Sequence, residues 1–173
     1  MSRIMAPCVL VGGAWLSSQA WAVAPLAAPA PAKRAAHVDW NEAGIQWKPL
    51  AAGLAEAAEN KKPVCLVVFT TWCPHCKRYS RIFHDSRIVE QTQGFVMIKL
   101  DQDQSEAESA RYAPDGGYIP RTLFLAPNGA VALEIHAPRP TYRHFFDEDD
   151  AGDLLAAMKT ARKKLGDKSG RNP

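Results

Sequence analysis

Cys73 and Cys76 are separated by two residues, a spacing that lets two thiols form a disulfide with each other. The apolar run Val64–Phe69 ends shortly before them and Pro74 follows Cys73, which predicts a buried strand leading into a helix. Free backbone N–H groups and the helix dipole at that helix start favour a thiolate at Cys73. We therefore predict that Cys73 is the attacking nucleophile and that Cys76, shielded one turn into the helix, is the resolving thiol.

His75 stands between the two cysteines and is predicted to bring a positive charge or a hydrogen-bond donor near the Cys73 sulfur. Stabilising the thiolate stabilises the reduced form, which makes the disulfide a stronger oxidant. A zinc site of Cys73, His75 and Cys76 is an alternative, but residues this close do not easily share one ion and no second ligand pair is apparent. Haem attachment requires a histidine directly after Cys76, where Lys77 stands. The predicted chemistry needs neither a metal nor an organic cofactor.

The elements that must position this motif alternate along the chain. Short apolar runs predict strands at 64–69, 95–100, 121–126 and 130–135. Asn128-Gly129 predicts a tight hairpin turn between the last two strands. Helical spacing predicts helices at 49–60, 74–84, 86–93, 107–112 and after Asp150, the last with an apolar side of Leu154, Leu155, Met158 and Leu165. This order predicts an α/β domain with one mixed central sheet flanked by helices.

The N-terminus has the pattern of a secretory signal peptide. Arg3 precedes an apolar stretch, residues 4–16, and Ala20-Trp21-Ala22 forms a cleavage site with a predicted cut after Ala22. The apolar stretch is shorter than the ~20 residues of a membrane span, so we predict no stable span in the mature protein; an uncleaved anchor is the alternative. The predicted organisation is a signal peptide (1–22), an Ala/Pro-rich linker (23–38), one domain (39–167) and a flexible tail (168–173).

Composition excludes several classes of protein. The chain has 173 residues, enough for one domain with a real core. The net charge of +3 comes from 21 basic and 18 acidic residues that are mixed along the chain, which argues against nucleic-acid binding. After signal cleavage only Cys65, Cys73 and Cys76 remain, so this is no scaffold of many disulfides. Cys65 lies in the apolar run and is predicted to pack as a small hydrophobic residue, with a regulatory thiol as the alternative.

The motif with its surroundings resembles the thioredoxin superfamily. The similarity lies in Trp72-Cys73-Pro74-His75-Cys76 after an apolar strand and in Ile119-Pro120 before a later strand. The Cys-Pro-His-Cys tetrapeptide is similar to that of the DsbA-type periplasmic disulfide oxidase. From Ile45 to about Gly166 the chain resembles the single-domain thioredoxin-like proteins of the endoplasmic reticulum in the anterior-gradient group, above all in the segment 114–121.

The resemblance implies a thioredoxin fold and a thiol–disulfide oxidoreductase that acts on exported, cysteine-containing proteins as an oxidase or isomerase. It implies that Pro120 follows a cis bond that faces the cysteines, with the backbone of Ile119 free to pair with an extended substrate. We predict that Trp72 is a partly exposed substrate platform, and that Tyr118 either lines the same surface or packs in the core. The protein is predicted to be periplasmic or secreted, and a membrane or soluble redox partner would reset the cysteine pair.

Two departures from the family pattern bear on the activity. Thioredoxins carry a buried acid six residues before the nucleophile, where this chain has Val67, which puts efficient reduction of substrates in doubt. The chain also has no room for the inserted helical domain of DsbA. Basic residues make either a positive site rim or a solvated helix face, namely Lys77, Arg78, Arg81, Lys99 and Arg121. The alternatives are a dedicated thiol reductase and a client-binding or chaperone module.

Overall fold

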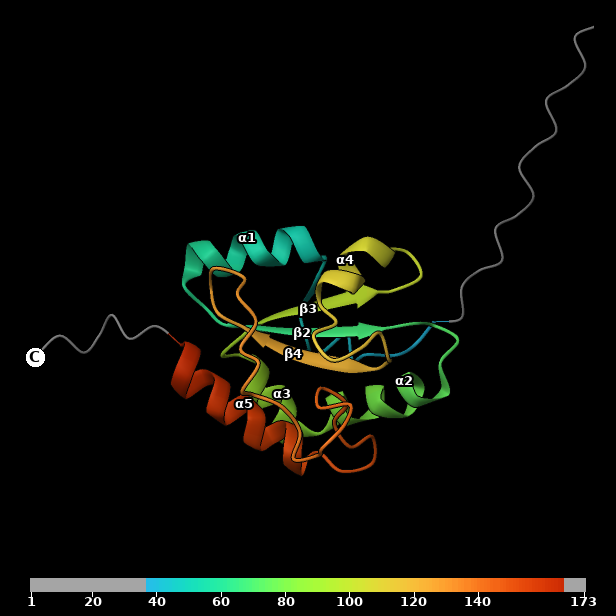
Figure 1. The fold of residues 1–173 in the computed structure, drawn as a ribbon. Helices are drawn as coiled ribbons and strands as arrows, with labels where there is room; N and C mark the ends of the chain where they lie inside the picture. The colour runs from blue at the N-terminus through green and yellow to red at the C-terminus, as the bar shows by residue number, and fades with distance from the viewer. Residues whose placement is uncertain (1–36, 167–173) are drawn as a thin grey trace, which may run out of the picture. The chain divides into compact units, whose positions relative to one another are not determined.

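A four-stranded mixed sheet is the centre of the computed structural model, which describes residues 37–166 (Figure 1). The predicted signal peptide, most of the predicted linker and the predicted tail lie outside these residues. The strands are β1 (Trp47–Lys48), β2 (Val64–Phe69), β3 (Val96–Asp101) and β4 (Arg121–Leu125), in the spatial order β1-β3-β2-β4. β1, β3 and β2 are parallel, whereas β4 is antiparallel to β2. The predicted single α/β domain with a mixed sheet is thus confirmed.

The central strand, β2, explains the longest apolar run of the domain. All six of its residues are buried, because β3 and β4 pair with it on either side and helices cover both faces. Its side chains alternate between two cores, with Val67 on one face and Leu66 on the other. A strand that is covered on both faces has a continuous apolar sequence rather than an alternating one, so the sequence predicts the bounds of β2 correctly.

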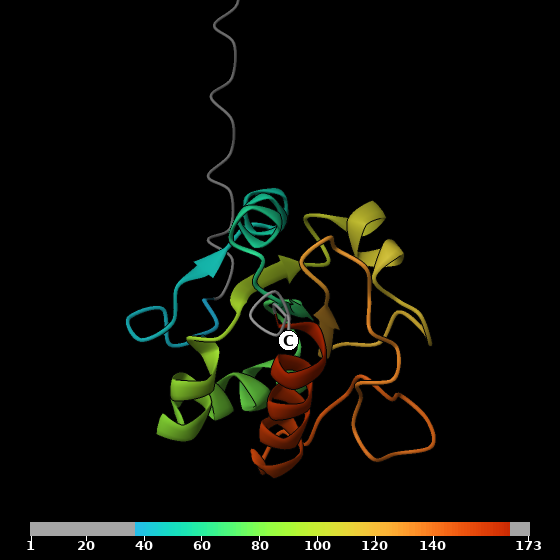
Figure 2. The same ribbon diagram turned by 90° about the vertical axis from the view of Figure 1, so that its left-hand side faces the viewer.

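Helices lie on both faces of the sheet (Figures 1 and 2). The elements α1 (Leu50–Asn60) and α4 (Glu106–Arg111) cover one face. The elements α2 (Pro74–Tyr79), the 3₁₀ turn Ser80–His84, α3 (Ser86–Thr92) and α5 (Gly152–Leu165) cover the other. The predicted helix 74–84 therefore changes from α to 3₁₀ geometry after Tyr79. In the part of the chain that the structure describes, no helix is both long and apolar enough to cross a bilayer.

The predicted strand at 130–135 is wrong. The turn before it does form, since Gly129 has φ +83° and the Ala126 amide donates to the Ala130 carbonyl at 2.8 Å. Only a single bridge between Leu125 and Val131 follows. The chain then turns, with the Ile135 amide donating to Ala132, because this turn buries Ile135 in the core beside α5. Sequence reasoning also missed β1, which is only two residues long.

A long segment without helix or strand, residues 126–151, joins β4 to α5 and is the orange loop of Figure 2. It covers the outer edge of β4, where the Thr122 amide donates to the His144 carbonyl at 2.8 Å. It then brings residues 145–148 to the start of α2, as the contacts of His75 show. The loop therefore includes the segment 130–135, which the sequence analysis assigns to a fourth strand, and it contributes side chains to the site described below.

Candidate active site

Cys73 lies at the junction of β2 and α2, as the N-cap residue of α2, with Pro74 in the first helical position. The backbone N–H of Cys76 donates to the Cys73 sulfur at 3.4 Å, and both residues are free thiols. Cys73 keeps 4% of its surface exposed, whereas Cys76 is fully buried. Both cysteines are thus buried, and of the two only Cys73 keeps any exposed surface.

The Cys76 thiol lies in the core between β2 and α2. Burial raises the pKa of Cys76, and the backbone hydrogen bond from Thr70 opposes that rise. Burial likewise raises the pKa of Cys65, which is fully enclosed and packs as a small apolar side chain. Val67 is buried at the position of the thioredoxin acid, and the buried polar residues between 37 and 166 include no carboxylic acid. Thr122 of β4 lies opposite Val67 in the sheet, and its hydroxyl is 2.8 Å from the hydroxyl of Tyr79.

His75 is directed toward a residue that sequence reasoning missed. Its Nδ1 atom lies 2.9 and 3.1 Å from the two carboxylate oxygens of Glu148. Arg78, one turn along α2, also binds Glu148, and the ring of Phe145 lies 5.9 Å from the imidazole. The predicted hydrogen bond from His75 to the Cys73 sulfur is not among the contacts of residues 37–166. The only sequence signal for Glu148 is its place in the acidic run 147–150 that precedes the last predicted helix.

The loop before β4 lies against the same core cluster as the two cysteines. The peptide bond between Ile119 and Pro120 is cis, as the resemblance implies. Ile119 is half-buried and packs on the cluster that contains Cys73 and Cys76. Within the described residues its backbone N–H and C=O make no hydrogen bond. They are therefore available to pair with an extended chain segment that lies across the site.

Trp72 and Tyr118 lie at different depths. Trp72 is 63% exposed, as predicted, and its indole N–H donates to Asp103 at 2.6 Å, which fixes the ring next to Cys73. Tyr118 is half-buried, so it fits neither a purely surface nor a purely core role. Its hydroxyl donates to Asp115 and accepts from the backbone N–H of His144 at 2.9 Å. Tyr118 thus ties the cis-proline loop to the long loop before α5.

Arg121 is not part of a positive rim, in contrast to one of the two predictions. It is 1% exposed and donates to the carbonyls of Tyr112, Tyr118 and Ser109 at 2.7–2.8 Å. It also donates to the side-chain oxygen of Gln102, and within residues 37–166 it has no carboxylate partner. Lys99 pairs with Glu42 instead of facing the cysteines. The basic side chains that stay exposed beside the motif are Lys77, Arg78 and Arg81 of α2 and the 3₁₀ turn.

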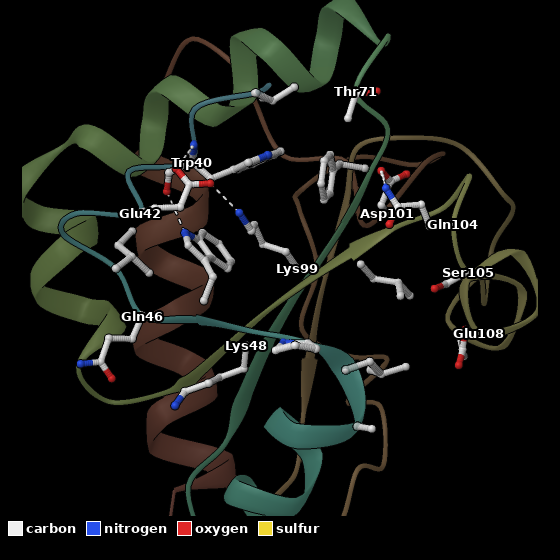
Figure 3. Close-up of a pocket in the computed structure, with 18 of the residues that line it drawn as sticks. Trp40, Glu42, Gln46, Lys48, Thr71, Lys99, Asp101, Gln104, Ser105 and Glu108 are labelled. Carbon is white, nitrogen blue, oxygen red and sulfur yellow. Dashed lines mark hydrogen bonds and ion pairs between the residues drawn. The ribbon is translucent and has the colours of Figure 1, made fainter. Parts of the chain in front are cut away.

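A separate pocket of about 980 Å³ opens beside β1 and the end of β3 (Figure 3). Its lining includes Trp40, Glu42 and Lys99. The Glu42 carboxylate accepts hydrogen bonds from the Trp40 backbone N–H at 3.1 Å and from the Lys99 ammonium at 2.5 Å. Neither cysteine of the motif lines this pocket.

Between residues 37 and 166, no group of three or more Cys, His, Asp or Glu side chains is arranged to hold a metal ion.

His144 should make the fold sensitive to mild acid. Burial lowers the pKa of its imidazole, and the charged or titratable groups that face it are Asp115, His136, Arg143 and Arg121. Because the unfolded chain binds a proton near pH 6.5 and the buried ring resists it, the free energy of unfolding falls as the pH drops below about 7.

We expect His144→Gln to lose part of this dependence, measured by urea unfolding at pH 7 and pH 5. Hydrogen bonds from Arg87 lower the pKa of Asp85 to about 2. Asp85 therefore does not titrate between pH 5 and pH 7 and does not contribute to this pH dependence. Equal pH dependence in the variant and the wild type would contradict the assignment to His144.

Comparison with known proteins gives consistent results. A family model of thioredoxin-like proteins matches residues 46–127. Anterior gradient protein 1 of Xenopus tropicalis is 29% identical over 129 residues, which cover 73% of this chain and 67% of that protein. The anterior gradient protein 2 homolog of Homo sapiens is 24% identical over 127 residues, which cover 73% and 71% of the two chains.

Two solved structures have the same fold at low sequence identity. A thioredoxin from Thermus thermophilus aligns with a TM-score of 0.54 at 18% identity, over 74% of this chain and 94% of that one. The first thioredoxin domain of mouse protein disulfide-isomerase A4 aligns with a TM-score of 0.50 at 12% identity, over 75% and 84%. The predicted fold is therefore confirmed by both chain geometry and structural similarity.

Proposed function

Because the chain is similar to thioredoxin-like proteins over residues 46–127 and to the anterior gradient proteins, we propose that it is a thiol–disulfide oxidoreductase that acts through Cys73 and Cys76. One observation carries this proposal. Cys73 caps a helix, accepts the amide of Cys76 and keeps part of its surface open, whereas Cys76 is enclosed. Such a pair can form a mixed disulfide at one sulfur and release it with the other.

In the oxidising direction, a substrate thiolate attacks the Cys73 sulfur and the Cys73–Cys76 bond breaks, with Cys76 leaving as a thiolate that takes up a proton. A second substrate thiolate then attacks the substrate sulfur attached to Cys73. The mixed disulfide breaks, Cys73 leaves as a thiolate, and the substrate carries the new disulfide. Two electrons pass from the substrate to the protein. The N–H of Cys76 and the start of α2 stabilise the departing Cys73 thiolate.

The open backbone of Ile119, next to the cis bond, supports the binding of an extended substrate segment across the cysteines. Exposed Trp72 supplies an aromatic surface on the neighbouring side. We propose that the substrates are cysteine-containing exported proteins in the periplasm or outside the cell. This part rests on the signal peptide predicted for residues 1–22, outside the described residues. A membrane or soluble partner then resets the cysteine pair.

We favour an oxidase or isomerase over a dedicated reductase because the Cys-Pro-His-Cys tetrapeptide is similar to that of the DsbA-type oxidase, and because Val67 stands where thioredoxins carry a buried acid that would take the proton of Cys76. Reduction of a substrate disulfide requires Cys76 to become an attacking thiolate, and burial disfavours that charged form. Within residues 37–166 no buried acid takes up this proton, and the reduction potential of the cysteine pair sets the direction of net electron flow.

The equilibrium between the Cys73–Cys76 dithiol and its disulfide tests the proposal. We expect an internal disulfide that forms reversibly in glutathione buffers, followed by Trp72 fluorescence and by thiol alkylation. A potential near the ~−120 mV of DsbA indicates a disulfide donor, and one near the ~−270 mV of thioredoxin indicates a reductase. If no internal disulfide forms, the redox proposal is wrong. Client binding that persists in a Cys73→Ser, Cys76→Ser double variant would then favour a binding module.

A further inference from the structure

Glu148 is an acid held against the start of α2 by the long loop before α5. Its side chain is only 12% exposed, although the neighbouring Asp147 and Asp149 lie on the surface. Both oxygens of its carboxylate lie within 3.1 Å of His75 Nδ1, and Arg78 donates to one of them. An exposed acid would be surrounded by water, whereas this one is enclosed with two side chains of the active-site helix.

The chemistry of the contact fixes which atom carries the hydrogen. A carboxylate only accepts hydrogen bonds, so Nδ1 of His75 must carry the hydrogen that lies between them. Arg78 also lies 3.1 Å from Nδ1, but two donors cannot hydrogen-bond to each other, so the bond of Arg78 is the one to the carboxylate. Glu148 therefore holds the Nδ1 side of the imidazole, and within residues 37–166 this nitrogen makes no hydrogen bond to the Cys73 sulfur.

Charge near the Cys73 sulfur sets the oxidising strength of the disulfide. A positive charge stabilises the Cys73 thiolate, favours the reduced protein and makes the disulfide a stronger oxidant. A negative charge in the same place has the opposite effect. Arg78 is always charged, so Glu148 cancels one positive charge beside the motif whether or not His75 is protonated. Its partial burial limits the screening of this effect by solvent.

We propose that Glu148 is a positioning residue that weakens the oxidising strength of the Cys73–Cys76 disulfide, by turning His75 away from the Cys73 sulfur and neutralising charge beside it. This inference rests on the proposed function and deepens it. The tetrapeptide Cys-Pro-His-Cys by itself predicts a strong oxidant, and Glu148 moves this protein toward the range in which disulfides can be both formed and rearranged.

The test is the glutathione equilibrium of Glu148→Gln, which keeps the size and an acceptor oxygen but removes the charge. We expect the midpoint to move toward more oxidising buffers by about three- to tenfold in the equilibrium constant, at most about 30 mV. Asp149→Asn removes the same charge one residue away, without contact to His75, and should leave the equilibrium unchanged. Glu148→Asp should restore most of the wild-type value, and Arg78→Gln should move the midpoint in the opposite direction.

A role of Glu148 that is only structural would change the stability of both redox forms equally and leave the midpoint in place. The electrostatic role also predicts that the difference between Glu148→Gln and wild type shrinks at high salt. An unchanged midpoint, or one moved toward reducing buffers, contradicts this inference while the proposed function stands. A wild-type protein that forms no internal disulfide contradicts both.

Discussion

Cys73→Ser is expected to abolish disulfide exchange, lowering the rate to the uncatalysed background, whereas Cys76→Ser should stop the reaction halfway. Serine has no thiolate to attack or to leave, so no mixed disulfide forms without Cys73. Without Cys76 the mixed disulfide at Cys73 forms by exchange with a substrate disulfide but has no internal thiol to resolve it. The two variants should differ in this order because Cys73, at 4% exposure, keeps some accessible surface, whereas Cys76 is fully buried.

The measurement is the oxidation or reduction of a dithiol peptide, with mass spectrometry of the trapped protein. Cys65→Ala is the matched control, because Cys65 is a third thiol in the same core and makes no contact with the proposed chemistry. The Cys65→Ala variant should keep its exchange activity and lose only the core contacts of the Cys65 side chain. Substrate trapped on Cys76 in the Cys73→Ser variant, or activity that depends on Cys65, would show that the nucleophile has been assigned to the wrong sulfur.

The largest loss of stability is expected for Arg121→Leu. The substitution leaves the carbonyls of Ser109, Tyr112 and Tyr118 without their shared donor in a buried site. Each buried polar group that loses its partner costs about 1–3 kcal/mol, so the loss of three partners should lower the free energy of unfolding by about 3 kcal/mol or more. Arg121→Lys should recover only part of this loss, because one ammonium group cannot reproduce a planar fork that reaches three carbonyls.

Urea unfolding of the reduced protein measures this effect. Arg81→Leu is the matched control, since Arg81 is an exposed arginine of the 3₁₀ turn, and it should stay within about 0.5 kcal/mol of wild type. Arg121 also anchors Tyr118 next to the cis bond, so exchange activity should fall even under conditions in which Arg121→Lys is fully folded. A change below about 1 kcal/mol for Arg121→Leu would contradict the role assigned to these bonds.

Elements with a strong local pattern were predictable. The bounds of β2 follow from an uninterrupted apolar run between Pro63 and Thr70. The acid of the first turn and the three basic residues of the last turn in α5 fit the helix dipole and mark that helix in the sequence. The segment 130–135 has the same kind of pattern as a strand, yet the core accepts Ile135 from a turn instead. A short apolar run does not distinguish a strand from a turn, because either one can bury the side chain of Ile135 in the core.

The reactive pair itself follows from the sequence alone. Cys73 and Cys76 are three residues apart at a helix start, so local backbone geometry brings the amide of one to the sulfur of the other in any fold that forms this helix. The proposed assignment of Cys73 as the nucleophile rests on the same helix, since Cys73 caps its start and Cys76 lies one turn inside it. The tertiary structure adds the degree of exposure and does not change the assignment.

The surroundings of that pair were decided by the tertiary structure. Glu148 lies 73 residues from His75 in the chain, and Arg121 is 19 residues from Gln102 and 12 from Ser109. These contacts depend on the path of the loop 126–151 and on the packing of α4 against the sheet, and neither leaves a periodic signal in the sequence. A motif of four residues determines which atoms can react. The long-range contacts determine the charge around them, because electrostatic interactions depend on distance in space and not on separation along the chain.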